Sequence, residues 1–175
     1  THRSAGLMEQ LVMGKNRERL LCKLRSADRY RRLRCYFPVV PGPHGAREVQ
    51  IHSKVMIADD KLLRVGSANL NNRSLHLDSE CDLAVEAASP ADRNRIAEIR
   101  NRLLAEHLGA APADVASILD ETGSVFAVID RLNQGPRGLR ACKIENGNGP
   151  TRPIPFTWLL DPSHPLGRGR GSPFG

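Results

Sequence analysis

One short stretch of the chain carries the side chains needed to attack a phosphodiester. It supplies an imidazole, an ammonium, a carboxylate, a hydroxyl and a carboxamide, from His52, Lys54, Asp59, Ser67 and Asn69. The spacing is His-x-Lys-x4-Asp-x6-Gly-Ser-x-Asn, and so many specified positions in fixed order rarely arise by chance. We therefore interpret the stretch as a catalytic motif rather than as a strand that happens to hold one histidine.

The residue types suggest how the roles are divided. An imidazole can attack phosphorus or carry a proton near neutral pH, which fits His52. The ammonium of Lys54 can neutralise a phosphate and stabilise charge in the transition state. Ser67 and Asn69 can donate hydrogen bonds to the remaining phosphate oxygens, so the expected phosphate-binding residues are Lys54, Ser67 and Asn69. The sequence predicts neither a metal site nor a cofactor for this chemistry.

Two carboxylates are counted with the catalytic residues in supporting roles. Glu80 is a candidate to bond the other ring nitrogen of His52 and fix its tautomer, and a plain surface carboxylate is the alternative. Asp59 could touch the reaction, but we favour an ion pair or a turn-stabilising role at the end of a strand. Gly66 would let the backbone come close to the substrate or to a neighbouring strand.

Hydrophobic periodicity places this motif on a hairpin. Strands are expected at 32–37, 49–58, 62–67 and 81–86, helices at 5–29, 90–108, 113–119 and 124–132, and a loop at 41–45. Side chains two residues apart in a strand share a face, so His52 and Lys54 are expected on one side of the sheet. The hairpin thus predicts a surface on which the imidazole and the ammonium work together.

The helix at 90–108 has the best end signals in the chain. Ser89 is the expected N-cap, with Pro90 at the first helical position, Asp92 three residues after the cap and Gly109 beyond the end. Its expected apolar face consists of Ile96, Ile99, Leu103 and Leu104. After residue 135 glycine and proline dominate, so we divide the chain into a catalytic segment at 1–135 and a tail at 136–175 with little regular structure.

The bulk composition limits the partners and the compartment. The chain has 175 residues, a net charge of +7 and a pI near 9.7, which favour polyanions such as nucleic acid, an anionic membrane surface or phosphorylated substrates. Residues 15–34 hold nine Lys or Arg and two acidic residues, and form either a solvated face or a contact with such a surface. No apolar run approaches the ~20 residues of a membrane span, so a cytoplasmic or peripheral membrane location is expected.

The cysteines and the first residue give two further expectations. Cys22, Cys35, Cys81 and Cys142 are widely and irregularly spaced, which favours free thiols over a disulfide framework, although one or two bridges remain possible. The chain starts at Thr1 rather than at Met, so we expect the native N-terminus to be missing.

The segments 51–59, 66–74 and 78–86 together resemble the phospholipase D superfamily, whose hallmark is the His-Lys-Asp motif. The flanking helices are similar to those in the C-terminal half of bacterial phospholipase D-like proteins. The resemblance implies an α/β fold, in which a mixed β-sheet has helices on both faces and is incomplete at the N-terminus. It also implies metal-independent transfer in two steps. One motif histidine forms a phosphohistidine, and a second protonates the leaving alcohol and then activates water or another alcohol.

The family's site needs two such motifs, and this chain has one. The other histidines lack a lysine two residues later with an aspartate five beyond it; they are His2, His44, His76, His107 and His164. We therefore expect the chain to be the C-terminal half of a two-motif protein. Its partner would be the N-terminal half of the parent protein or a second copy of the chain. Alone, it should have little or no turnover.

Three functions remain open at this point. The first is phospholipid hydrolysis or phosphatidyl transfer by an enzyme half, and the second is a homodimeric nuclease or phosphodiesterase. The third is a catalytically silent half that binds lipid or a partner chain. Nucleic acid is the less favoured partner, because no interleaved pattern of aromatic and basic residues indicates base stacking.

Overall fold

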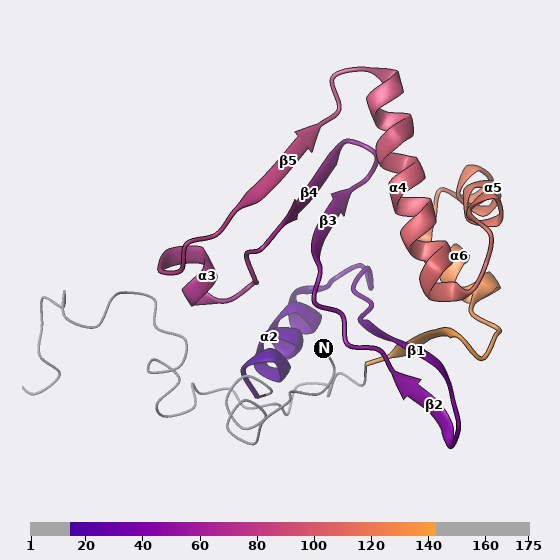
Figure 1. Cartoon of the computed structure of the whole chain (residues 1–175), viewed down its shortest axis with the longest axis horizontal. Coiled ribbons are helices and arrows are strands. Elements are labelled where there is room, and N and C mark those ends of the chain that lie inside the picture. The colour runs from indigo at the N-terminus through magenta and orange to yellow at the C-terminus, as the bar shows by residue number, and fades with distance from the viewer. Residues whose placement is uncertain (1–14, 143–175) are drawn as a thin grey trace, which may run out of the picture. The chain divides into compact units, whose positions relative to one another are not determined.

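The computed structural model describes residues 15–142, which fall into two compact units. Unit 1 holds residues 32–64 and 84–142, and unit 2 holds residues 15–31 and 65–83. The elements in chain order (Figure 1) are α2 (Lys15–Ala27), β1 (Tyr36–Gly42), β2 (Gly45–Glu48), β3 (Lys54–Ala58), β4 (Leu62–Gly66), α3 (Asn72–His76), β5 (Asp82–Glu86), α4 (Pro90–Leu108), α5 (Pro112–Thr122), α6 (Val125–Leu132) and β6 (Gly138–Ala141). The α/β class is confirmed, with two small antiparallel sheets.

The first sheet has the order β2-β1-β6, with β1 antiparallel to both neighbours. The strand expected at 32–37 starts later, at Tyr36, and runs on through part of the expected loop to Gly42. Gly42 pairs with Gly45, so the reversal takes only two residues. Gly45 has a φ of 113°, a conformation that L side chains rarely adopt, and this explains the glycine after the turn.

Strand β6 was not expected, because we predicted little regular structure after residue 135. It pairs with β1 from Gly138 opposite Val39 to Ala141 opposite Tyr36. The carboxamide of Asn133 holds the backbone of β6 through two hydrogen bonds. Its Nδ2 donates to the Leu139 carbonyl at 2.7 Å, and its Oδ1 accepts from the Leu139 N–H at 2.8 Å. Four residues held by a distant strand and by one side chain leave no periodic signal in the sequence.

The second sheet has the order β3-β4-β5. The single strand predicted at 49–58 is wrong, because the chain forms β2 in the first sheet, crosses residues 49–53 without a strand, and enters β3 at Lys54. The strands predicted at 62–67 and 81–86 are confirmed to within one residue. His52 therefore lies in a connection between two sheets, two residues before β3 begins.

Helix α4 has the predicted bounds and end signals. The Ser89 hydroxyl accepts from the Asp92 N–H at 3.2 Å, Asp92 Oδ2 accepts from the Ser89 N–H at 3.0 Å, and Gly109 ends the helix at a φ of 65°. The predicted apolar face is wrong in part, since Ile99 and Leu103 are exposed. Ile96 is buried as predicted, and the other buried residues are Asn101, Ala105 and Leu108, which follow helical spacing.

The core of unit 1 lies where α4, α5 and α6 meet (Figure 1). Its centre is Ala105, Leu108, Val115 and Val128, and the partly buried side chains around it are Leu104, Ala110, Ile118, Leu119, Leu132 and Leu139. Leu139 connects β6 to this core. The predicted helices at 113–119 and 124–132 are confirmed, with α5 longer than expected at both ends. No helix within residues 15–142 is long and apolar enough to cross a membrane.

Unit 2 contains α2 and α3. Of the helix predicted at 5–29, residues 15–27 are helical, and the part before residue 15 lies outside the described residues, as does the tail after residue 142. Asn71 caps α3, because its side chain accepts from the Ser74 N–H at 2.9 Å. Ser74, the last residue of the segment 66–74, is buried.

We predict that Ser89→Ala lowers the free energy of unfolding by about 1 kcal/mol, because the variant loses the N-cap of the longest described helix. Urea denaturation followed by circular dichroism measures this change. Ser89→Thr keeps the hydroxyl and should lose less than half as much. Equal stability of the alanine variant and the parent would contradict the role assigned to this cap.

Candidate functional site

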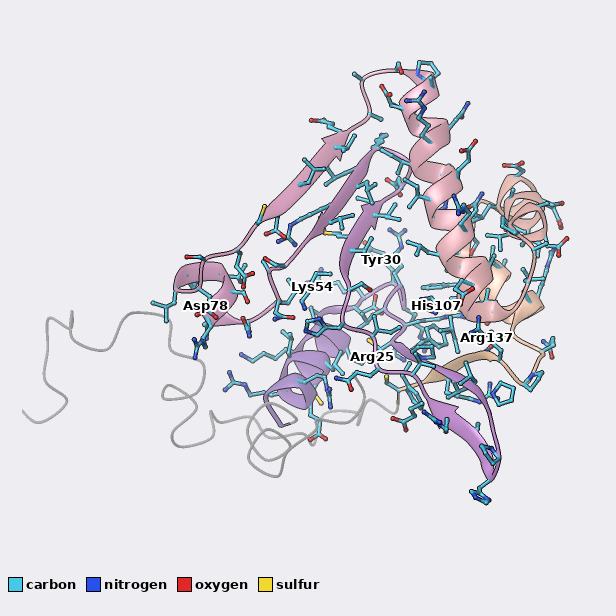
Figure 2. All side chains as sticks on the ribbon, in the orientation of Figure 1. Arg25, Tyr30, Lys54, Asp78, His107 and Arg137 are labelled. Carbon is cyan, nitrogen blue, oxygen red and sulfur yellow. The ribbon has the colours of Figure 1, made fainter. Side chains whose placement is uncertain are left out.

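His52 and Lys54 form a contact within unit 1. Lys54, labelled in Figure 2, places its Nζ 3.1 Å from Nε2 and 3.3 Å from Nδ1 of the His52 ring. The same Nζ donates to the His52 carbonyl at 2.8 Å. The ammonium therefore lies within hydrogen-bond distance of both ring nitrogens. The imidazole is exposed and the lysine half-buried, so a dissolved phosphate can reach both. The two side chains are in contact, but not as neighbours on one face of a strand, because His52 lies before β3 begins.

This contact has a chemical consequence for the ring. An ammonium is only a donor, so a ring nitrogen that bonds Lys54 must offer its lone pair. Attack on phosphorus would use this lone pair, so the ammonium would have to leave the ring nitrogen for a phosphate oxygen as the substrate binds. The arrangement can thus present a nucleophile and a positive charge to one phosphate.

Asp59 occupies the turn between β3 and β4. Its φ is 54°, in the left-handed region that Asp and Asn tolerate better than other non-glycine residues. The Lys61 N–H closes the turn on the Ala58 carbonyl at 3.1 Å, and Asp60 pairs with Arg93 at 3.9 Å. The positive φ of Asp59 fits a turn-stabilising role, and its role stays a prediction.

Ser67 and Glu80 form a second cluster, within unit 2. The Ser67 hydroxyl donates to Glu80 Oε2 at 2.5 Å and accepts from the Cys81 N–H at 3.0 Å. The pKa of Glu80 is lowered, first by the Ser67 hydroxyl and then by that of Ser74, against the repulsion of nearby Asp78 and Asp82. Ser74 was not singled out in the sequence, although its place three residues after a capping asparagine was a signal that could have found it.

The surroundings of residue 66 explain why the motif has a glycine before the serine. The Ser67 N–H donates to the Cys81 carbonyl at 3.1 Å, so the chain after β4 runs close beside the start of β5. A Cβ at Gly66 would lie 2.8 Å from the Asp82 Cα and would overlap the Asp82 carboxylate. The same carboxylate accepts from the Ala68 N–H at 3.4 Å. The close approach to a neighbouring strand that we predicted is therefore present.

The predicted site residues thus fall into two groups. His52, Lys54 and Asp59 belong to unit 1, whereas Ser67, Asn69 and Glu80 belong to unit 2. Asn69 is exposed just after β4. The orientation of His52 by Glu80, and the convergence of both groups on one phosphate, stay predictions.

A separate hollow of about 510 Å³ lies along α4 in unit 1 and holds no motif residue. Ile99 and Leu103 line it, and Arg137 borders it (Figure 2), donating to Glu106 Oε1 at 2.6 Å. Within residues 15–142, no group of three or more His, Cys, Asp or Glu side chains could hold a metal ion.

Comparison with known proteins identifies the motif segment. The model of the phospholipase D family matches residues 44–129. Phospholipase D zeta 1 of Arabidopsis thaliana is 34% identical over 91 residues, which is 45% of this chain and 8% of that protein. Phospholipase D of Phytophthora infestans is 38% identical over 102 residues, or 51% of this chain and 6% of that protein. Phospholipase D alpha 1 of Nicotiana tabacum is 37% identical over 81 residues, 42% of this chain and 9% of that protein.

The chain therefore spans less than a tenth of the length of these relatives. They come from eukaryotes, so they lend no support to the bacterial origin that we predicted. No solved structure matches the chain.

For Asp59 we predict opposite results from two substitutions. Asp59→Asn keeps a side chain that tolerates the left-handed region, so stability and any turnover should stay close to the parent. Asp59→Ala should lower the free energy of unfolding by about 1 kcal/mol through backbone strain. Urea denaturation checks the second result. Loss of turnover in a stable Asp59→Asn variant would instead assign the carboxylate to the chemistry.

We also predict that Ser67→Ala raises the pKa of Glu80 toward its usual value, because the largest stabilising hydrogen bond to the carboxylate is lost. Ser74→Ala is the matched control and should raise the pKa less. An NMR titration of the Glu80 carboxyl carbon measures both. Since the lowered pKa belongs to the folded state, the stability from this cluster is present above the unfolded pKa and disappears as the pH falls through the folded value. Equal shifts in the two variants would contradict this ranking.

Proposed function

Because this chain belongs to the phospholipase D superfamily, we propose that it supplies one of two catalytic motifs of a phospholipase D-type enzyme. The observation that carries the proposal is the contact between Lys54 Nζ and the His52 ring at 3.1 Å. The proposed reaction is phosphodiester hydrolysis or phosphatidyl transfer through a phosphohistidine. The whole enzyme's substrates and partners are part of this proposal, because the chain covers so little of its relatives.

The first step forms one bond and breaks another. A ring nitrogen of His52 attacks phosphorus, the bond from phosphorus to the leaving oxygen breaks, and a histidine of the second motif gives that oxygen a proton. In the second step the same histidine takes a proton from water or an alcohol, whose oxygen displaces the imidazole. Lys54 offsets the negative charge that the phosphate oxygens carry in both transition states. The opposite assignment, with His52 as the acid, uses the same groups.

Asn69 and Ser67 are proposed to complete the phosphate site. The support for this proposal is the motif itself, in which Gly-Ser-x-Asn follows Asp59 at a fixed spacing. Ser67 has one proton to donate, and without substrate Glu80 accepts it. A bound phosphate would therefore compete with Glu80 for Ser67, and a released Glu80 could then orient His52.

The second motif has to come from another segment or another copy of the chain, and the exposed edge strand β5 offers a surface for it. All five of its residues are exposed, including Leu83 at 69% and Val85 at 42%. Exposed apolar side chains on a strand at a sheet edge are typical of surfaces that another segment covers. We propose that the N-terminal half of the parent enzyme, or a second copy of this chain, occupies this edge.

Phospholipid is the proposed substrate, because the relatives that match are named phospholipase D. A nuclease is the second candidate, favoured by the net charge of +7. The two differ in salt dependence. DNA binding should weaken steeply between low and physiological salt, whereas hydrolysis of a neutral-headgroup phospholipid in mixed micelles should change little.

We predict that His52→Ala lowers phosphodiesterase activity by about 10²- to 10⁴-fold, the size typical of acid–base catalysis. The activity is measured on phospholipid micelles and on a chromogenic phosphodiester, over a range of chain concentrations. Activity per chain that rises with concentration indicates a site completed by a second copy. His76→Ala is the matched control, because it removes another exposed histidine and should leave the rate unchanged.

Binding of inorganic phosphate provides a test that does not need turnover. Phosphate should shift the NMR signals of the His52 ring in the parent chain, and Lys54→Met should weaken that binding at least several-fold. An acid-labile phosphoryl adduct that is lost in His52→Ala would support the nucleophile assignment. Absence of both phosphate binding and turnover would leave the silent binding half as the better description and overturn the proposed enzyme.

A further inference from the structure

Two of the four cysteines lie opposite each other on paired strands. In the β1–β6 pair Tyr36 lies opposite Ala141, and the next step of the same antiparallel register places Cys35 opposite Cys142. The Cys142 N–H donates to the Cys35 carbonyl at 2.8 Å, so the ladder continues to this pair. Both residues belong to unit 1, and both are in the reduced thiol form in this structure.

This placement suits a covalent bridge. Directly opposed residues of an antiparallel pair point to the same face, and the Cα atoms of a hydrogen-bonded pair are about 5.5 Å apart. Disulfides span Cα separations of roughly 4.4–6.8 Å, so the backbone has no need to move far. The other two cysteines, Cys22 and Cys81, belong to unit 2 and are not part of this ladder.

The pair is also accessible to an oxidant. Cys35 and Cys142 are both half-buried rather than sealed in the core. Burial raises the pKa of the Cys35 thiol, so the thiol needs a mildly alkaline solution to react quickly. Because neither residue is sealed in the core, an oxidant can approach the pair. Its reaction with a thiol becomes faster as the pH rises and the thiol ionises.

The core holds the two strands in register at their other end. Val39 in β1 is buried, and Leu139 in β6 packs against the core of unit 1. The pairing there is Pro38 opposite Leu139 and Val39 opposite Gly138. The two strands are thus fixed where the core holds them, a few residues from the point where the two cysteines meet.

We propose that Cys35 and Cys142 form a reversible disulfide bond that ties β1 to β6 under oxidising conditions. An external disulfide, such as oxidised glutathione, is the oxidant. One thiolate attacks it and forms a mixed disulfide with release of one small thiol. The second thiolate then attacks the protein sulfur of that mixed disulfide and releases the other small thiol. The two cysteines lose two electrons and two protons, and the oxidant gains them.

The proposed bridge would enclose the catalytic motif. Residues 36–141 lie between the two cysteines, and they include the whole family-matched segment at 44–129. Closing so long a loop restricts the unfolded chain strongly, while the folded strands are already paired. Oxidation should therefore make the motif-bearing part of the chain harder to unfold.

The test uses the full chain in two matched variants. Cys22→Ser with Cys81→Ser keeps only the proposed pair, and Cys35→Ser with Cys142→Ser keeps only the other two cysteines. Both are treated with oxidised glutathione without denaturant at about pH 8.5, near the ordinary pKa of a cysteine thiol. The remaining thiols are then counted, the mass is measured, and the melting temperature is compared before and after reduction.

We expect the first variant to lose both thiols, to gain no glutathione and to stay monomeric, with a melting temperature higher by about 5 °C or more until it is reduced. The second variant should form no bridge within the chain, and its melting temperature should not rise. Glutathione that remains attached to Cys35 or Cys142, or a bridge that joins two chains, would overturn the proposal. If the serine variants do not fold, peptide mapping of the oxidised parent chain decides, and absence of a peptide linked through Cys35 and Cys142 overturns it equally.

Discussion

The contact between the Lys54 ammonium and the His52 ring is the interaction on which the proposed chemistry depends. His52 is not in a strand, because the chain leaves the first sheet at Glu48 and enters the second at Lys54. Lys54, as the first residue of β3, has a fixed backbone, and its Nζ bonds both the ring and the carbonyl of His52. The exposed pair adds little to stability. In the proposed mechanism its value lies in positioning, because it holds a cation beside the proposed nucleophile before substrate arrives.

The serine cluster of unit 2 follows the same principle with different groups. Ser67 bonds Glu80 and the Cys81 N–H at once, and the absence of a side chain at Gly66 lets the backbone run this close to Asp82. The Ser67 hydroxyl therefore has protein partners without substrate. A phosphate that entered would exchange hydrogen bonds with these partners rather than order a loose loop, which reduces the entropy lost on binding.

Local signals in the sequence were sufficient for some elements and not for others. The N-cap of α4 depends on Ser89 and Asp92, three residues apart, and Gly109 ends the helix. These local signals allowed the sequence alone to locate both ends. Strand β6 depends on pairing with β1 and on the carboxamide of Asn133, and neither leaves a local pattern. The exposed positions of Ile99 and Leu103 were missed for a similar reason, since α5 and α6 decide which face of α4 is covered.

The spacing of the motif is set partly by the lengths of β3, of the turn after it and of β4. The four residues between Lys54 and Asp59 are the remainder of β3, and the six between Asp59 and Gly66 are the rest of the turn and most of β4. Asp59 stands where the backbone adopts a φ of 54°, and Gly66 where a Cβ would collide with Asp82. Two of the specified positions are thus explained by backbone geometry. Sequence reasoning found the motif because chemistry and geometry constrain it together. The structure explains the geometric positions, and the catalytic roles stay predictions.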